Sequence, residues 1–248
     1  MPRYRLNLEY DGGGFVGWQR QANGLSVQEA LEAALLALTG VETRVNGAGR
    51  TDAGVHAMGQ VAHIDLPAPW SLKALRDGLN FHARPAPVAV LEAFDAPPEF
   101  DARFSATRRR YRYRILNRRS PPMLERGHVW YVAKPLDAAA MQAGANCLLG
   151  RHDFSSFRAV HCQAKSPIRT LDRLDVVQRG EEIHLEVEAR SFLHNQVRIT
   201  AGTLARVGDG AWPPERVGEA LAARARAAAG PTAPPEGLYL MEVGYDSL

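Results

Sequence analysis

The sequence predicts an α+β protein built from two ferredoxin-like halves, each with the element order β-α-β-β-α-β. Strand and helix patterns follow that order between residues 3 and 94, and the same order repeats between residues 108 and 243. The length of 248 residues suits one large domain or two of ordinary size. We expect one domain at 1–104 and another at 105–248, with a central active-site cleft where they meet.

The first half opens at residues 3–10, where apolar and polar side chains alternate as in a half-buried strand. A capping box of Ser26 and Glu29 then starts a helix with apolar residues at helical spacing, and Gly40 ends it. The remaining elements are, in order, strands near 43–46 and 60–66, a helix from Ser71, and a strand at 88–94.

The second half opens with a strand at 108–116, in which Tyr111 and Tyr113 point to one face and arginines to the other. Asp137 caps the next helix, which we expect to end at Gly150. The remaining elements are, in order, strands near 171–177 and 183–189, helices at 195–207 and 214–228, and a last strand at 238–243.

The composition excludes several classes of protein. Hydrophobic residues make up 46% and charged residues 23%, so the chain is neither disordered nor collagen-like. No apolar run approaches the roughly 20 residues that cross a bilayer, and the N-terminus lacks a secretory apolar stretch. Two cysteines provide neither a disulfide framework nor a CxxC zinc site, and the histidines show no metal spacing. We therefore expect a soluble cytoplasmic protein with no membrane contact and no metal.

Positive charge is concentrated in one stretch of the chain. Residues 103–126 contain nine arginines and one glutamate, although the net charge of the whole chain is only +3. A basic stretch on an otherwise acidic molecule favours a polyanionic partner such as a nucleic acid. The alternative is a solvated strand face.

One polar segment is framed by glycines between two predicted strands. In the sequence GAGRTDAGVHA at 47–57, Asp52 offers a carboxylate that could act as a nucleophile or as an acid or base. Arg50 could keep that carboxylate ionised or contact a phosphate. The segment is neither a P-loop nor a dinucleotide-binding turn. The alternative is a tight turn in which Asp52 bonds its own backbone.

Two further stretches suit RNA binding. Residues 10–21, YDGGGFVGWQRQ, interleave glycines with aromatic side chains, and a glycine-rich turn with core aromatics is the alternative. In the strand at 108–114, RRRYRYR, one face can neutralise phosphates and the other offers rings on which a base can stack. The phosphate-binding candidates are Arg108, Arg109 and Arg110.

Taken together, these stretches resemble the tRNA pseudouridine synthase A family. The matching segments lie in order along essentially the whole chain, and GRTDAGVHA is the most specific of them. They are YDGGGFVGWQRQ at Tyr10–Gln21, AGRTDAGVHA at Ala48–Ala57, FDARFSATRRRYRYRI at Phe100–Ile115, DFSSFRA at Asp153–Ala159, FLHNQVR at Phe192–Arg198 and EGLYL at Glu236–Leu240.

The resemblance implies an isomerase with the pseudouridine synthase fold that converts uridine to pseudouridine in the tRNA anticodon stem-loop, at tRNA positions 38, 39 and 40. It implies no cofactor, tRNA as partner and a homodimer. Asp52 is the implied nucleophile, Tyr111 binds the target uridine, Arg50 takes part in base flipping, and Arg198 lies beside the nucleophile. Further RNA-binding residues implied by the matching segments or by position are Phe100, Arg103, Phe104, Arg119, Tyr131, Cys162 and Gln163.

The expected chemistry fits these residues. Isomerisation breaks the N1–C1′ bond, rotates uracil and joins C5 to C1′, and a carboxylate could attack either uracil C6 or the ribose. A base inside a stem must first be extruded, and the long planar side chain of Arg50 could fill the gap. Two other classes remain open: a non-catalytic RNA-binding module, and a hydrolase that uses Asp52. The hydrolase would need a second carboxylate or a metal, and the sequence offers neither.

Overall fold

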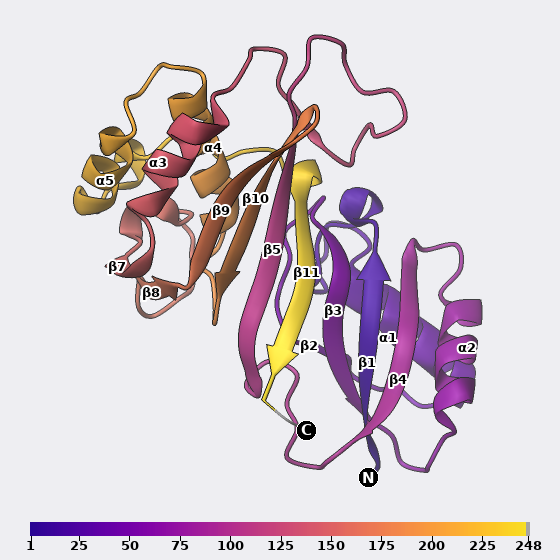
Figure 1. The fold of residues 1–248 in the computed structure, drawn as a ribbon. Helices are drawn as coiled ribbons and strands as arrows, with labels where there is room; N and C mark the ends of the chain where they lie inside the picture. The colour runs from indigo at the N-terminus through magenta and orange to yellow at the C-terminus, as the bar shows by residue number, and fades with distance from the viewer. Residues whose placement is uncertain (247–248) are drawn as a thin grey trace. The chain divides into compact units, whose positions relative to one another are not determined.

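The computed structural model describes residues 1–246 and divides the chain into two compact units (Figure 1). The first comprises Met1–Thr107 together with the C-terminal strand from Tyr239, and the second comprises Arg108–Leu238. The break after Thr107 lies close to the expected boundary between 104 and 105. The last strand, which we expected in the second domain, clusters with the first unit instead.

The first unit has the predicted order β-α-β-β-α-β. Its elements are β1 (Arg3–Tyr10), α1 (Val27–Thr39), β2 (Asn46–Gly47), β3 (His56–Asp65), α2 (Leu72–His82) and β4 (Val88–Ala96), and β11 (Leu238–Tyr245) joins them from the far end of the chain. The strand order is β4-β1-β3-β11, with β2 paired to β3. Strand β11 runs parallel to β3, with Tyr239 opposite His56. Strand β1 pairs with β3 and with β4, and both of these pairings are antiparallel.

Local sequence signals account for these elements. In β1 the side chains of Tyr4, Leu6, Leu8 and Tyr10 are buried, as the alternation predicts. The Ser26 hydroxyl accepts a hydrogen bond from the Glu29 N–H at the start of α1, and Gly40 ends that helix with a left-handed φ of +72°. Helices α1 and α2 lie together on one face of the sheet, behind β1 and β4 in Figure 1.

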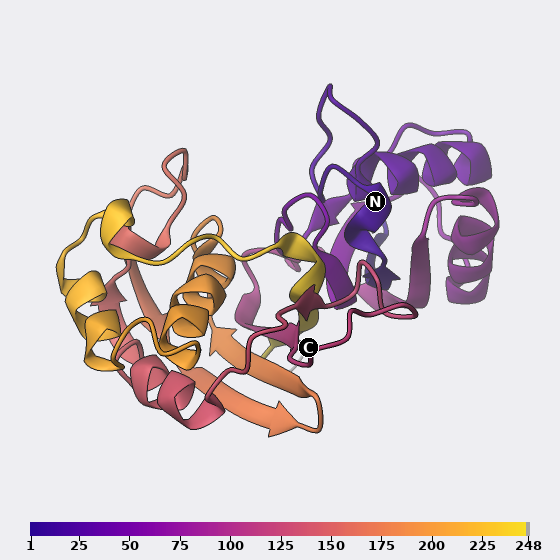
Figure 2. The same ribbon diagram turned by 90° about the horizontal axis from the view of Figure 1, so that it is seen from above.

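The second unit follows the order β-α-β-β-α with additions. Its elements are β5 (Ala106–Leu116), β6 (Trp130–Tyr131), α3 (Ala138–Asn146), β7 (Gly150–Asp153), β8 (Ile168–Leu171), β9 (Arg173–Arg179), β10 (Glu182–Ala189), α4 (Gln196–Gly208) and α5 (Glu215–Ala222). Strands β5, β10 and β9 form an antiparallel sheet, β6 runs parallel along β5, and β7 and β8 form a separate hairpin. Helices α3, α4 and α5 pack together beside this sheet (Figure 2).

The α+β class is confirmed. Besides the place of β11 and the unexpected short strands β6 and β7, the differences from expectation concern element ends. The helix expected to reach Gly150 stops at Asn146, where the Cys147 N–H donates to the Gly144 carbonyl, and Gly150, with a φ of +89°, starts β7. The strand expected near 171–177 divides at Asp172, because β8 before it pairs with β7 whereas β9 after it pairs with β10. The helix expected at 214–228 ends at Ala222, before a left-handed Arg224. No helix within residues 1–246 is long and apolar enough to cross a membrane.

Candidate active site

Asp52 lies in the loop that connects β2 to β3 in the first unit, and antiparallel pairing of the two strands closes the base of this loop. The Val55 N–H donates to the Asp52 carbonyl at 3.1 Å, and Gly54 supplies the left-handed φ of +78° within the turn. Asp52 is half-buried and Arg50 is exposed. Two of the predicted site residues are therefore brought together on one short, closed loop.

The preceding glycine-rich segment packs directly against this loop. The Trp18 N–H donates to the Thr51 carbonyl at 3.0 Å. Gly17 has a φ of +111°, and a Cβ there would lie 2.7 Å from the Thr51 oxygen and 3.2 Å from the carbonyl carbon of Asp52. A Cβ on Gly47 would meet the Trp18 ring at 2.4 Å. Glycine is required at both positions because no side chain fits in these contacts.

A buried polar network reaches the same loop from the sheet. The Tyr10 and Thr51 hydroxyls lie 2.8 Å apart. The Gln60 amide nitrogen donates to the Gly49 carbonyl at 2.8 Å and, more weakly, to the Tyr10 hydroxyl at 3.4 Å. Burial raises the pKa of Tyr10 to about 12, so its hydroxyl keeps its proton near neutral pH.

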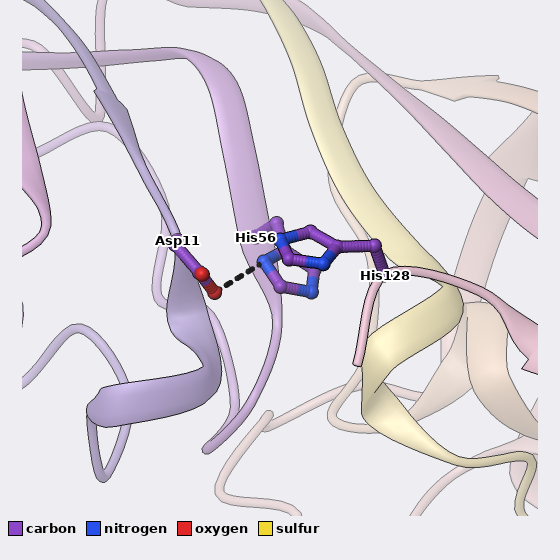
Figure 3. Close-up of side chains that lie close together, drawn as sticks. All are labelled: Asp11, His56 and His128. Carbon is purple, nitrogen blue, oxygen red and sulfur yellow. Dashed lines mark ion pairs between the residues drawn. The ribbon is translucent and has the colours of Figure 1, made fainter. Parts of the chain in front are cut away.

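The first residue of β3 is fixed by a histidine contact. His56 Nδ1 lies 3.0 Å from Asp11 Oδ1 (Figure 3) and 3.0 Å from the Gly12 nitrogen. It accepts from the Gly12 N–H when Nδ1 carries no proton and donates to the Asp11 carboxylate when it carries one. The His56 ring is 2% exposed and stacks on Tyr239 with 4.7 Å between ring centroids. Figure 3 also draws His128, which belongs to the second unit. These contacts tie the end of the Asp52 loop to the glycine-rich turn and to β11.

The FDARF segment forms a capped turn that separates its residues into two roles. The Asp101 carboxylate accepts hydrogen bonds from the N–H groups of Arg103 and Phe104. Phe104 is 75% exposed, and the Arg103 guanidinium lies over its ring at 5.5 Å from the centroid. Phe100, which we expected to bind RNA, is 1% exposed and packs against Tyr245. Its side chain belongs to the core, and only Arg103 and Phe104 are presented to solvent.

Strand β5 also sorts its predicted residues by face. Tyr111 is buried, and its ring meets Phe192 edge-on with 5.2 Å between centroids. Arg109 shares this face: it is buried and donates to the Arg190 carbonyl at 2.5 Å. The expectation that all arginines of the strand lie opposite the tyrosines is wrong for Arg109, because a two-residue period places 109, 111 and 113 together. Arg108 is exposed and Arg110 half-buried.

Further along β5, arginines pair with carboxylates of the neighbouring strand. Arg112 forms an ion pair with Glu186 at 2.7 Å. Arg114 binds both oxygens of Glu182, at 2.7 and 2.9 Å, and also Glu125 at 2.7 Å. The Arg114 guanidinium lowers the pKa of Glu182 to about 2. Part of the basic stretch is thus neutralised within the unit.

Arg198 lies in the first turn of α4. Its Nε donates to the Ala233 carbonyl at 2.8 Å, and its Nη1 donates to Asn195 Oδ1 at 3.1 Å. Asn195 precedes the helix in a left-handed conformation, with a φ of +62°. Helix α4 approaches the following chain closely, since a Cβ on Gly202 would stand 2.0 Å from the Pro231 carbonyl oxygen. The Arg198 guanidinium is therefore held by two hydrogen bonds, one to Asn195 and one to Ala233.

The remaining predicted residues lie in loops or at a short strand. The Tyr131 hydroxyl, on β6, donates to the Arg119 carbonyl, so the structure brings this pair together. Cys162 is half-buried and Gln163 exposed, in the loop that precedes β8. The Cys162 N–H closes a turn by donating to Ala159 O at 3.0 Å.

Sequence reasoning did not single out Thr51, Gln60 or His56. Gln60 carries a signal in retrospect, because it is the one polar residue in the run 57–62, and its amide is fully buried. Thr51 and His56 carry no such signal, since each is one polar residue among several in the GRTDAGVHA segment. Their contacts depend on residues about 40 positions away along the chain.

Comparison with known proteins gives the class to which the chain belongs. Residues 8–105 and 145–246 match a family model described as tRNA pseudouridine synthase. The class of protein is therefore that of the pseudouridine synthases, which are isomerases.

Similar proteins extend over nearly the whole chain. Proteins named tRNA pseudouridine synthase A from Rhodospirillum rubrum, Parvibaculum lavamentivorans and Sinorhizobium fredii are 57%, 56% and 58% identical. In each case the match covers 99% of this chain, and it covers 88%, 100% and 100% of the respective relatives. The chain belongs to the tRNA pseudouridine synthase A family. The solved "Crystal Structure of a Cbf5-Nop10-Gar1 Complex" aligns with 12% identity and a TM-score of 0.38, over 96% of this chain and 49% of that one, and the assignment does not rest on it.

Proposed function

We propose that this protein isomerises uridine to pseudouridine at positions 38, 39 and 40 in the anticodon stem-loop of tRNA, with Asp52 as the nucleophile. The observation that carries the proposal is the Asp52 loop, closed at its base and packed by glycines on one side, in a chain whose full length matches the family. A half-buried carboxylate on a fixed loop suits attack at a defined carbon atom.

The proposed reaction balances without an oxidant or reductant. The N1–C1′ bond of the target uridine breaks, uracil rotates, and C5 bonds to C1′. The proton lost from C5 is balanced by the proton gained at N1. The Asp52 carboxylate forms a transient bond either to C1′ or to uracil C6, and it leaves unchanged at the end of the cycle.

The target base must leave the helical stack before Asp52 can reach it. We propose that Arg50, which is exposed on the Asp52 loop, takes part in extruding the base and occupies the space it leaves. The Tyr111 ring, held edge-on by Phe192, supplies an aromatic surface for the extruded uracil. Arg198 is proposed to lie beside the Asp52 carboxylate and keep it ionised, since the family resemblance pairs these two positions.

Several exposed or half-buried side chains are proposed to bind the tRNA backbone and bases. Phe104 with Arg103 offers a stacking surface backed by a cation, and Arg108 and Arg110 offer charges for phosphates. Arg119, Tyr131, Cys162 and Gln163 are proposed to extend this contact. Arg109 is left out of the phosphate contacts because its guanidinium is buried and bonded. We further propose that the enzyme acts as a cytoplasmic homodimer.

The test is formation of pseudouridine in a tRNA transcript in the presence of a metal chelator. We expect the wild-type protein to form pseudouridine at the three anticodon-stem positions and the Asp52→Asn variant to form none. The tRNA affinity of the variant should stay within a few-fold of the wild-type value, because phosphate contacts dominate binding. Asp77→Asn, at an exposed position of α2, is the matched control and should retain full activity.

Other outcomes would assign another function. Tight tRNA binding without any modification would support an RNA-binding module. Release of free uracil would support a hydrolase. Residual turnover of Asp52→Asn above about a tenth of wild type would remove the residue from the nucleophile's role.

A further inference from the structure

Three buried polar side chains form one hydrogen-bonded chain under the Asp52 loop. Tyr10 lies at the end of β1, Gln60 lies inside β3, and Thr51 directly precedes Asp52. Their exposed fractions are 4%, 0% and 7%, so water does not replace their mutual contacts. Buried hydroxyl and amide groups are retained in a protein interior only when they are hydrogen-bonded, and here each is.

The partners of Gln60 fix the direction of its own hydrogen bonds in this chain. Its carbonyl oxygen accepts from the Val61 N–H at 3.2 Å, and its amide nitrogen donates to the Gly49 carbonyl at 2.8 Å. Rotating the amide by 180° would set two oxygens against each other, so the nitrogen also faces the Tyr10 hydroxyl. Tyr10 therefore accepts from Gln60 and shares a second hydrogen bond with the Thr51 hydroxyl, in which either hydroxyl can be the donor.

The two anchored residues, Gly49 and Thr51, lie on either side of Arg50. Gln60 holds the Gly49 carbonyl, and Tyr10 holds the Thr51 hydroxyl, while the Thr51 carbonyl accepts from the Trp18 N–H. The backbone from 49 to 51 is thus fastened at three points by residues that lie in β1, β3 and the glycine-rich segment. Asp52 is the next residue, so these three contacts restrict the position of its backbone.

We propose that Tyr10 and Gln60 are positioning residues, which act through the Thr51 hydroxyl and the Gly49 carbonyl to set the position of the Asp52 carboxylate. This inference rests on the proposed role of Asp52 and extends it to two buried residues that contact the loop from the sheet. A displacement of about 1 Å at a reacting group can lower the rate about a hundredfold. A small shift of the Asp52 loop on loss of these hydrogen bonds would therefore lower the rate measurably.

The first experiment changes the Thr51 hydroxyl with almost no change in shape. Thr51→Val removes the hydroxyl, and Thr51→Ser keeps it. We expect Thr51→Val to lower kcat at least about tenfold while KM and tRNA affinity stay within about threefold. Thr51→Ser should restore most of kcat. A purely structural role would make both variants lose activity in proportion to their loss of thermal stability.

The second experiment uses a matched pair of tyrosines on one strand. Tyr10→Phe removes the hydroxyl bonded to Thr51. Tyr4→Phe, on the same buried face of β1, removes a hydroxyl that accepts from the Trp70 N–H at 2.8 Å, away from the Asp52 loop. Both variants should lose stability, but only Tyr10→Phe should lower kcat. The double variant Tyr10→Phe with Thr51→Val should be no slower than the slower single variant, because the two hydroxyls act as one unit.

The outcomes separate this inference from the function it rests on. An inactive wild-type protein or an active Asp52→Asn variant would remove the proposed function. If the wild type is active and Asp52→Asn is not, an unchanged kcat in both Thr51→Val and Tyr10→Phe would overturn the positioning network. Equal decreases in kcat in Tyr4→Phe and Tyr10→Phe would overturn it as well. So would a decrease in the double variant equal to the product of the decreases in the two single variants.

Discussion

Gly17 lies so close to Thr51 that a Cβ on the glycine would stand 2.7 Å from the threonine carbonyl oxygen. Gly17 also has a left-handed φ of +111°, which side chains other than glycine rarely adopt. The backbone of the Asp52 loop therefore rests on a surface that only glycine can provide at this point of the chain.

Gly17→Ala should therefore impair catalysis as well as stability. Gly40→Ala is the matched control, because Gly40 is also left-handed, with a φ of +72°, but has open space around it. Gly40→Ala should lose about 1–2 kcal/mol of unfolding free energy from backbone strain, and Gly17→Ala should lose more because its Cβ also meets the Thr51 carbonyl oxygen. Only Gly17→Ala should lower kcat, as measured by pseudouridine formation at saturating tRNA. Equal kcat values in the two variants would contradict this role of the contact.

The basic strand should separate into a binding residue and a folding residue. Arg108→Gln removes an exposed charge, so the plot of log affinity for tRNA against log salt should become flatter by about one unit if one phosphate contact is lost. Arg109→Gln removes a buried hydrogen-bonded cation and should cost about 2 kcal/mol of stability instead. Arg179→Gln, exposed on β9, serves as the control with an unchanged slope. An unchanged slope for Arg108→Gln would show that Arg108 makes no phosphate contact.

The ion pair of Arg114 with Glu182 predicts a dependence of stability on acid. The pKa of Glu182 is lowered from 4.5 to about 2, first of all by the Arg114 guanidinium. A lowered folded-state pKa stabilises the protein above the unfolded value, and that stability is lost as pH falls from about 5 to about 2. Allowing for solvent screening, Glu182→Gln should cost about 1–2 kcal/mol at pH 6.

The check is urea unfolding of both proteins across this range of pH. The difference in stability between wild type and Glu182→Gln should narrow steadily below pH 5. Glu181→Gln, at the exposed neighbouring position that pairs with Arg118, should show almost no difference at any pH. A constant gap for Glu182→Gln down to pH 2 would show that the ion pair does not control this dependence.

The proposed pairing of Arg198 with Asp52 predicts a shift in the pH–rate profile. Removing a nearby cation makes a carboxylate harder to ionise, so Arg198→Leu should move the acidic limb of the profile to higher pH and remove most of the activity. Arg206→Leu, on the same helix and paired with Asp209, is the control. An unshifted acidic limb in an active Arg198→Leu protein would refute the pairing and leave the nucleophile assignment untouched.

Much of the secondary structure follows from the sequence because its causes are local. The alternation at 3–10, the Ser26 cap and the Gly40 stop each act within a few residues, and they predict β1 and α1 closely. The GRTDAGVHA motif likewise identifies the candidate nucleophile and the family. Element ends at Gly150 and Arg224 differ from expectation, because a left-handed residue can end a helix or start a new segment, and the sequence alone does not distinguish these outcomes.

The sequence by itself determined the α+β class, the element order of the first half, the family and the loop that holds Asp52. Only the tertiary structure decided that β11 pairs with β3, that Arg109 is buried, and that Tyr10 and Gln60 meet under Thr51. The physical reason is range along the chain. Strand pairing and buried hydrogen bonds join residues tens to hundreds of positions apart, and each polar group is satisfied by whichever partner the folded sheet brings within about 3 Å.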